Sequence, residues 1–313
     1  MGAKDNFTCK VCSQSFETER SLHAHFKKHG MTMAEYYTKY YPRNNLLTGE
    51  PLPFKNKEQY FNEDFSNRRQ LIKWCDKTGR NEVKPYILEM LKKRINSKSL
   101  EFGPSHLELK ISSLPTIDIY KRHFGSYSNA CTEAGAKPMF TKPLPECWNS
   151  GQYSDTKIFI DTREQQPLEF KNSESLKLEF GDYAVGGEDY AYTYVDRKGE
   201  QDFKSTLSKN NLERFREELS RTKQFDSYLY IVVESDLTQI YKNNRWGPHK
   251  SNLKYIYHNM RVLAHEFAGT CQFLFTGSRE NSELIIPKLL VLGDKLWDVD
   301  LQYYIDKDGL GQG

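Results

Sequence analysis

Two acidic residues and a lysine lie close together near the middle of the chain, in the segments Phe180–Tyr183 and Tyr194–Lys198. Asp182 is in the first segment, and Asp196 and Lys198 are in the second. Carboxylate oxygens bind hard divalent cations such as magnesium, and a neighbouring lysine can orient a water molecule or stabilise the charge that develops on a phosphorane. These residue types therefore indicate metal-assisted hydrolysis of a phosphodiester.

A β-hairpin would bring these side chains together. Gly186–Gly187 lies between the two segments and favours a tight turn, and the residues on either side have the character of strands. An apolar run upstream ends at Asp161 and is followed by Glu164, and Asp202 lies downstream, so five acidic residues and one lysine gather in this region. The alternative is a surface hairpin with solvated charges, because a lone Asp-x-Lys tripeptide is common.

At these residues the chain resembles the XPF-type structure-specific nuclease domain, a branch of the PD-(D/E)XK nuclease superfamily. The family's Asp-x-Arg-Glu matches Asp161–Glu164, its Gly-Asp-Tyr matches Gly181–Tyr183, and its Glu-Arg-Lys-x-x-x-Asp matches Asp196–Asp202. Asp196 stands where that branch usually has glutamate, which shortens the carboxylate arm by one methylene and keeps a ligand that the superfamily uses. The resemblance covers about residues 157–290.

The resemblance implies a catalytic magnesium or manganese ion and suggests its ligands. Asp182 and Asp196 would hold the ion together with Asp161. Glu164 would complete the ligands or bind a second ion. The resemblance also implies in-line attack by water, which leaves one product with a 5′-phosphate and the other with a 3′-hydroxyl. Paired nuclease domains are usual in this branch, so a homodimer is expected.

Four further residues of these motifs receive roles from the same resemblance. Lys198 would assist the attacking water, and the carbonyl oxygen of Arg197 would add a ligand to the metal ion. Asp202 and Arg163 would orient neighbouring groups, and Arg163 would also contact a phosphate of the DNA.

The segment after the motifs keeps the alternation of helices and strands that is typical of an α/β layer fold. Together with the resemblance, it predicts a multidomain α/β protein whose residues 156–313 form a restriction-endonuclease-like domain with a mixed central sheet. Apolar spacing predicts helices over 211–223, 253–267 and 282–296, and apolar runs predict buried strands over 228–234 and 271–276.

The amino-terminal segment has the ligand spacing of a zinc finger. Two cysteines stand two residues apart, twelve residues follow, and two histidines then stand three residues apart. A tight turn can present two thiolates and a helix two imidazoles, which suits tetrahedral zinc, and Phe16 and Leu22 would supply a small apolar core. The predicted structural zinc ligands are Cys9, Cys12, His25 and His29. A reduced cysteine pair beside ordinary surface histidines is the alternative.

Such a ββα finger can place its helix in the major groove of DNA, although single fingers also bind proteins or support a neighbouring domain. Arg20 is the candidate for reading guanine, and Lys27 is a further candidate DNA contact. The other residues around the helix start are serine, threonine and glutamate, so base-specific reading by this finger alone is weakly supported. A short helix is predicted after the finger, at 32–40.

Residues 83–140 resemble the small helical repeat associated with homing endonucleases. A helix at 87–95, Pro104-Ser105 with Glu108-Leu109, and the run 114–130 match the parts of that repeat, with Tyr127 where tryptophan is usual. Its helices would place Lys121 and Arg122 on an exposed basic face that binds DNA phosphates. A purely structural helical connector is the alternative interpretation.

Charge is distributed unevenly along the chain. Residues 1–150 contain 24 Lys and Arg against 16 Asp and Glu, a balance of +8, whereas the remaining residues contain 21 against 26, a balance of −5. The basic half is expected to hold DNA, and the acidic half fits a site that needs a metal ion to approach phosphate. Proline-rich stretches predict linkers, which gives the predicted divisions 1–42, 43–82 with a helix at 57–78, 83–140, 141–155 and 156–313.

Composition excludes a membrane span and a disulfide-stabilised fold. No apolar stretch reaches the thickness of a bilayer, and the first six residues lack an apolar signal core. We therefore expect an intracellular protein, in the cytoplasm of a bacterial or phage-infected cell. The four cysteines outside the finger are isolated in sequence and are expected to be reduced packing residues.

The first functional hypothesis is a magnesium-dependent DNA endonuclease directed to sequence, of the homing or mobile-element type, in which finger and repeat position the DNA. A structure-selective nuclease acting on branched DNA is the nearest alternative, although the double helix-hairpin-helix usual in that branch has no evident place after residue 296. A DNA-binding regulator with an inactive nuclease fold is disfavoured by the intact acids and lysine. An RNA-processing factor lacks support from any RNA-binding motif.

Overall fold

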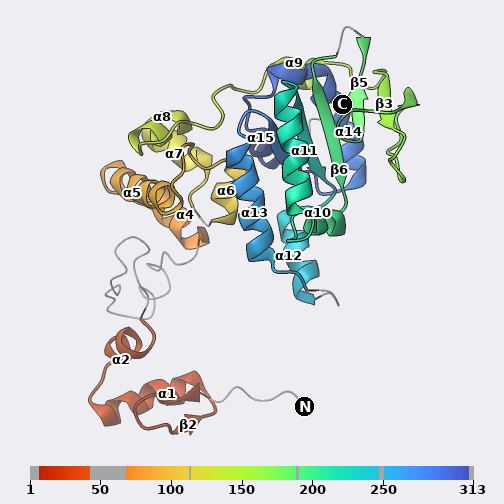
Figure 1. The fold of residues 1–313 in the computed structure, drawn as a ribbon. Coiled ribbons are helices and arrows are strands. Elements are labelled where there is room, and N and C mark those ends of the chain that lie inside the picture. Colours follow the sequence, from red (N-terminus) through yellow and green to blue (C-terminus); the bar gives the residue numbers. More distant parts are fainter. Residues whose placement is uncertain (1–6, 43–67, 113, 188–189, 247–249, 310–313) are drawn as a thin grey trace. The chain divides into compact units, whose positions relative to one another are not determined.

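The computed structural model describes two compact units (Figure 1). The first comprises residues 1–97 and 113–130, and the second comprises residues 98–112 and 131–313. The predicted linker at 43–54 and the first part of the helix predicted at 57–78 lie outside the described residues. The structure describes residues 7–42, 68–112, 114–187, 190–246 and 250–309.

The first unit begins with the predicted ββα finger and a helix that follows it. The two short strands pair antiparallel, with Phe7 opposite Phe16, and Thr18 caps the first helix through a hydrogen bond from the backbone nitrogen of Ser21. The elements are β1 (Phe7–Thr8), β2 (Ser15–Phe16), α1 (Glu19–His25), the 3-10 helix η1 (Phe26–His29) and α2 (Met33–Tyr40).

Helix α2 packs on the finger and enlarges its small core. The Tyr36 ring is fully buried and stacks on Phe26 with 3.8 Å between ring centroids, and its hydroxyl accepts a hydrogen bond from the Lys10 backbone nitrogen. Thr32 and Glu35 form a capping box that fixes where α2 begins. The finger and α2 therefore form a five-element structure whose stability includes aromatic stacking.

Four more helices lie in or next to the first unit among the residues that the structure describes. Arg80 donates a hydrogen bond to the His123 carbonyl oxygen, and Arg122 forms an ion pair with Asp76. Gly125 ends one of these helices with φ of +82°, a conformation that glycine adopts without steric cost. The helix predicted at 87–95 lies inside a longer one. The elements are α4 (Arg68–Lys77), α5 (Arg80–Lys98), α7 (Ile117–Phe124) and α8 (Tyr127–Glu133).

The second unit contains a mixed six-stranded sheet in the order β4-β3-β5-β6-β7-β8. Strand β5 pairs antiparallel with both β3 and β6, whereas β3–β4, β6–β7 and β7–β8 pair parallel. The mixed central sheet predicted from the sequence is confirmed, as is the hairpin formed by β5 and β6. The strands are β3 (Ile158–Asp161), β4 (Ser173–Leu176), β5 (Tyr183–Val185), β6 (Thr193–Lys198), β7 (Tyr228–Val233) and β8 (Cys271–Phe275).

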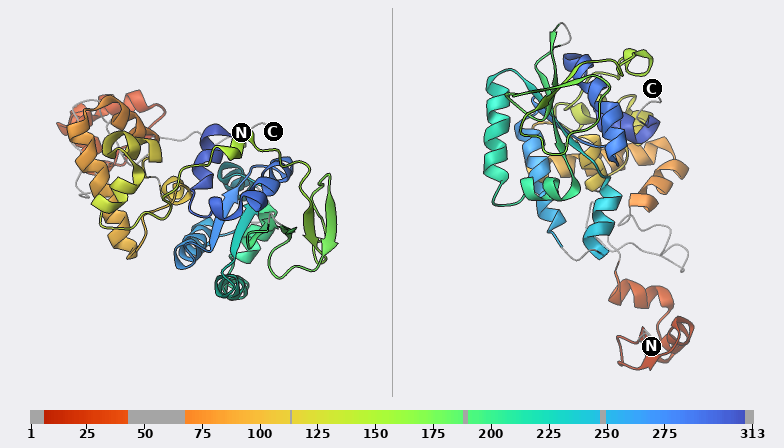
Figure 2. Two further views of the ribbon diagram at one scale, coloured as in Figure 1. Left: turned by 90° about the horizontal axis from the view of Figure 1, so that it is seen from above. Right: turned by 90° about the vertical axis from the view of Figure 1, so that its right-hand side faces the viewer.

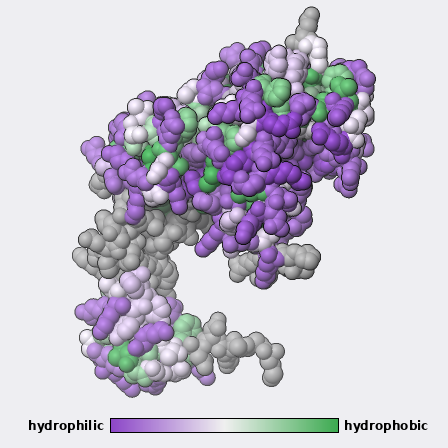
Figure 3. Space-filling view, viewed as in Figure 1, coloured by the Kyte–Doolittle hydropathy of each residue, from purple (hydrophilic) through white to green (hydrophobic). Residues whose placement is uncertain are grey.

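Helices cover both faces of this sheet and give it two apolar cores (Figure 2). Helices α10–α13 pack on one face, and α9, α14 and α15 pack on the other. The outer surface of the helices on the first face is mainly hydrophilic, as amphipathic helices require (Figure 3). The helices are α6 (His106–Ile111), α9 (Cys147–Ser150), α10 (Glu200–Thr206), α11 (Leu212–Gln224), α12 (Leu237–Trp246), α13 (Leu253–Glu266), α14 (Arg279–Leu292), η3 (Gly293–Lys295) and α15 (Leu301–Asp308).

The segment predicted as a linker, 141–155, packs within the second unit. Trp148 is 2% exposed and lies in the core that α14 forms with the sheet. The backbone nitrogens of Thr141 and Lys142 donate to the Asp298 carbonyl oxygen. The prolines of this segment disfavour long helices, and the buried tryptophan together with these hydrogen bonds holds the chain within the second unit. No helix among the described residues is long and apolar enough to cross a bilayer.

Helix α6, which the sequence placed in the repeat, also belongs to the second unit. The backbone N–H of His106 donates a hydrogen bond to the Asp300 carboxylate. The His106 ring and the Lys110 ammonium lie 2.9 and 2.7 Å from the Asp306 carboxylate. On the same helix, the Glu108 carboxylate lies 2.7 Å from the His265 ring. These long-range polar contacts anchor α6 to α13 and α15.

Replacing Asp306 with asparagine is expected to lower the free energy of unfolding by about 1 kcal/mol at neutral pH, because solvent screens part of the interaction of this partly exposed carboxylate. Burial raises the pKa of Asp306, but hydrogen bonds from His106 and Lys110 outweigh it and hold the pKa at about 2, below the ordinary 3.8. Because the pKa is depressed in the folded protein, the stabilisation is complete above about pH 4 and disappears as the pH falls toward about 2. The difference in urea midpoint between wild type and variant should shrink over that range, and a constant difference would contradict the assignment.

Candidate active site and metal centre

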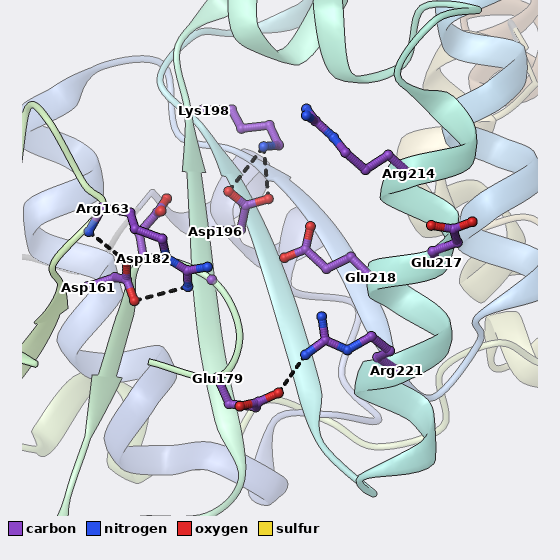
Figure 4. A pocket seen from close by; sticks show the side chains of 11 residues that line it. Asp161, Arg163, Glu179, Asp182, Asp196, Lys198, Arg214, Glu217, Glu218 and Arg221 are labelled. Carbon is purple, nitrogen blue, oxygen red and sulfur yellow. Dashed lines mark hydrogen bonds and ion pairs between the residues drawn. The ribbon is translucent and has the colours of Figure 1, made fainter. Parts of the chain in front are cut away.

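A pocket of about 400 Å³ opens beside the β5–β6 hairpin and helix α11 (Figure 4). Six acidic and four basic side chains line it, so the lining carries an excess of negative charge when all are ionised. That excess suits a divalent cation. The lining residues are Asp161, Arg163, Glu179, Gly181, Asp182, Asp196, Lys198, Arg214, Glu217, Glu218 and Arg221.

The backbone around Gly181 places Asp182 in the pocket. Gly181 has φ of +61°, and a Cβ there would lie 2.6 Å from the Val195 carbonyl oxygen, so the close approach of the two segments requires glycine. The Asp182 nitrogen donates to the same Val195 oxygen over 2.7 Å, and one Asp182 carboxylate oxygen accepts from the Arg197 nitrogen, also over 2.7 Å. The Asp182 side chain is therefore held by the hairpin itself.

Asp196 and Lys198 lie together on β6, with their side chains on the pocket side of the sheet (Figure 4). The Lys198 Nζ lies 2.9 Å from Asp196 Oδ2 and 3.1 Å from Oδ1, and about one tenth of each side chain is exposed. Burial lowers the pKa of Lys198, but the charges of Asp196 and Asp202 outweigh burial and raise it. The charges of these acidic neighbours therefore favour the ammonium form of Lys198.

Two more carboxylates face Asp196 from different elements. Burial, together with the charge of Asp196, raises the pKa of Asp182 to about 8. The same two causes raise the pKa of Glu218, which comes from α11 and points toward Asp196 (Figure 4). Each of these carboxylates disfavours ionisation of the others. A divalent cation bound between them would reduce this repulsion. Carboxylate oxygens are the donor type that a hard metal ion prefers.

Asp161 lines the pocket, but its oxygens already have protein partners. It is 2% exposed and accepts hydrogen bonds from the backbone nitrogens of Leu178 and Arg163, both over 2.7 Å. The Arg163 guanidinium also pairs with it, at 2.7 and 3.1 Å. Burial raises the pKa of Asp161, yet these hydrogen bonds lower it overall. Asp161 thus closes the loop after β3, and its predicted metal role stays a prediction.

Glu164 lies outside the pocket lining and binds Arg197 instead. The Arg197 guanidinium is held between Glu164 and Glu234, at 3.0 Å from each carboxylate, with one tenth of its side chain exposed. Burial lowers the pKa of Arg197, and the nearby acidic groups raise it overall. The backbone nitrogen of Arg197 also donates to the Asp182 carboxylate. The buried ion cluster therefore holds in place the residue that positions Asp182. The predicted metal role of Glu164 likewise stays a prediction.

Asp202 stands at the edge of the site. It lies on α10, 3.8 Å from the Lys198 Nζ, with 59% of its side chain exposed. This position agrees with the orienting role inferred from the motif, although the pocket lining does not include it.

Sequence reasoning missed the contribution of α11. Four charged residues on this helix line the pocket at the spacing i, i+3, i+4 and i+7, which places them on one face. The opposite, buried face carries Phe215 and Leu219. The charged residues at helical spacing directly after the motifs could have indicated that this helix faces the site. Glu179, from the loop before β5, forms an ion pair with Arg221 at 2.5 Å. The α11 residues are Arg214, Glu217, Glu218 and Arg221.

The four predicted zinc ligands come together at the finger. Their donor atoms all lie within 4.8 Å of one another. Cys12 Sγ is 3.2 Å from His25 Nε2, and Cys9 Sγ is 3.7 Å from His29 Nε2. Two thiol sulfurs and two imidazole nitrogens at such spacings match a tetrahedral zinc site in donor type and number.

The predicted DNA contacts are distributed over both units. Arg20 and Lys27 are exposed on the finger, and Lys121 and Arg122 are exposed on α7. Arg163 is mostly exposed but pairs with Asp161.

Comparison with known proteins gives a partial likeness. No family model and no curated protein matches the chain. Among solved structures, XPF from Aeropyrum pernix is similar with a TM-score of 0.34 and 20% identity, over 44% of this chain and 67% of that chain. XPF from Aeropyrum pernix in complex with DNA gives the same TM-score of 0.34 and 23% identity, over 50% of this chain and 76% of that one.

Proposed function

We propose that this protein is a metal-dependent DNA endonuclease whose active site is the pocket beside the β5–β6 hairpin. The observation that supports it best is the convergence of Asp182, Asp196 and Lys198, together with Glu218, in one acidic pocket. The motif resemblance assigns the first three of these residues to the same chemistry. Charged residues on an ordinary solvent-exposed hairpin would not be buried and paired as Asp196 and Lys198 are.

In this proposal Asp182 and Asp196 hold a magnesium or manganese ion. When bound, the ion would activate water and neutralise charge on the phosphodiester. Lys198 supplies a fixed positive charge at the pocket and orients Asp196 through their ion pair. Arg197 acts through its backbone nitrogen, which holds Asp182 in place. Asp161 and Glu164 shape the surrounding loop, and Asp202 orients Lys198.

We further propose that the finger and the helical region of the first unit direct the enzyme to its DNA, which makes it sequence-directed, of the homing or mobile-element type. The basic balance of residues 1–150 and the exposed Arg20, Lys27, Lys121 and Arg122 support DNA binding by this part. A structure-selective nuclease is the second candidate, which the XPF-type motifs favour. Two copies of the chain acting together would cut both strands.

The test is cleavage of supercoiled, linear and branched DNA by the full chain with magnesium, with calcium and with a chelator. We expect cutting with magnesium only, and its loss in Asp196→Asn while the variant remains folded by circular dichroism. Preference for a branched substrate would select the second candidate, and discrete fragments from a long duplex would select the first. Retained DNA binding without cutting under any condition would overturn the nuclease assignment and favour a DNA-binding regulator.

A further inference from the structure

One cation in the pocket lining differs from the other three. Arg163 pairs with Asp161, Lys198 pairs with Asp196, and Arg221 pairs with Glu179. Arg214 also lines the pocket, but it makes no hydrogen bond or ion pair with any other residue that the structure describes. Its charge is therefore available to a ligand.

The position of Arg214 favours a negatively charged ligand. It lies in the first turn of α11, which begins at Leu212, so the positive end of the helix dipole adds to its charge. Its guanidinium reaches toward Lys198 across the mouth of the pocket (Figure 4). Arg214 and Lys198 thus bring two positive charges to the same pocket, and hydrogen bonds between a guanidinium and phosphate oxygens are strengthened by charge.

The pocket itself makes such a group necessary. Asp182, Asp196 and Glu218 would repel an approaching phosphodiester, and a bound divalent ion would offset only part of their charge. A guanidinium is suited to phosphate because its planar donors can bind two oxygens at once. An arginine at this position would therefore attract the DNA backbone, and its paired donors would orient the phosphate that it binds.

We propose that Arg214 binds a backbone phosphate of the DNA strand that is cut and positions the scissile phosphodiester over Asp182 and Asp196. This inference rests on the proposed function of the pocket. Arg214 acts by positioning: it raises the affinity of the strand and aligns it, whereas the acidic residues and Lys198 serve the reaction.

The test measures DNA binding without cleavage, in the Asp196→Asn background. Arg214→Gln is compared with Lys223→Gln, which removes one positive charge from the last turn of the same helix, outside the pocket lining. Dissociation constants are measured over a series of salt concentrations. We expect Arg214→Gln to weaken binding at least several-fold and to lower the slope of log K against log salt by about 0.7 to 0.9, the value for one lost phosphate contact.

The comparison with Lys223→Gln separates a specific phosphate contact from general electrostatic attraction. Lys223→Gln should change both quantities much less, and Arg214→Lys should recover part of the affinity because it restores the charge without the planar donors. Equal effects of Arg214→Gln and Lys223→Gln would mean general attraction only and would overturn the inference. In the cleavage-competent chain, Arg214→Gln should mainly raise KM. Failure of the proposed function would appear separately, as absence of cutting by the wild type.

Discussion

Lys198→Met is expected to lower the rate of DNA cleavage by on the order of 10³-fold, with the fold and DNA binding retained. The Lys198 ammonium is the cation paired with Asp196, and the charges of Asp196 and Asp202 outweigh burial and raise its pKa. Methionine keeps most of the apolar stem of the side chain and removes the ammonium group, with its charge and its hydrogen bond to Asp196. Single-turnover cleavage of a labelled substrate with saturating magnesium measures the effect on the chemical step.

Lys204→Met is the matched control for that experiment. Lys204 is 4% exposed and forms an ion pair with Glu200 on α10, but it does not line the pocket. The substitution therefore makes the same chemical change at a comparably buried lysine a short distance away. Its cleavage rate should stay near that of the wild type. Equal losses in the two variants, or an undiminished rate in Lys198→Met, would contradict the role of Lys198.

Cys12→Ser is expected to abolish zinc binding and to unfold the finger while the second unit stays folded. Structural zinc sites of this type contribute about 10–16 kcal/mol of apparent binding energy, which a core of four buried residues cannot replace. Tyr36 would lose its stacking on Phe26 when α1 unfolds. Metal analysis should find one zinc per chain in the wild type and none retained by the variant, and limited proteolysis should become rapid within residues 7–42.

Cys147→Ser provides the comparison, because Cys147 is a free cysteine in the second unit and is no zinc ligand. This variant should keep its zinc and its resistance to proteolysis. Cleavage of a non-specific substrate at high enzyme concentration should survive Cys12→Ser, since the residues that line the pocket all belong to the second unit. Complete loss of cleavage, with the second unit still folded, would refute the separation of roles between the two units.

Local sequence patterns were sufficient for the hairpin and the finger. Asp182, Asp196 and Lys198 lie within one hairpin, so glycine at the turn and alternating strands already bring them together. The zinc ligands are likewise close in sequence. The partners of Asp161 and Glu164 were harder to foresee, because Leu178 and Arg197 reach them only through the closing of loops around the sheet. Their chemical type suggested metal binding, whereas the structure gives them protein partners.

Contacts between distant segments could not be derived from the sequence. Glu218 and Arg214 face the site because α11 packs its apolar side on β7, and that placement depends on the order of strands. The attachment of α6 depends on Asp300 and Asp306, nearly two hundred residues away from His106. Family resemblance assigned α6 to the repeat, and no periodicity within one helix indicates which distant acid will bind it.

The ion cluster around Arg197 also bears on how the site responds to heat. Dehydrating buried ions is costly near room temperature, but this cost falls on warming because the hydration of ions becomes less favourable. The contacts of Arg197 with Glu164 and Glu234 are therefore relatively better tolerated in a warm protein than in a cold one. Since Arg197 also holds Asp182, the catalytic geometry should persist up to global unfolding, and activity should be lost together with the fold and not before it.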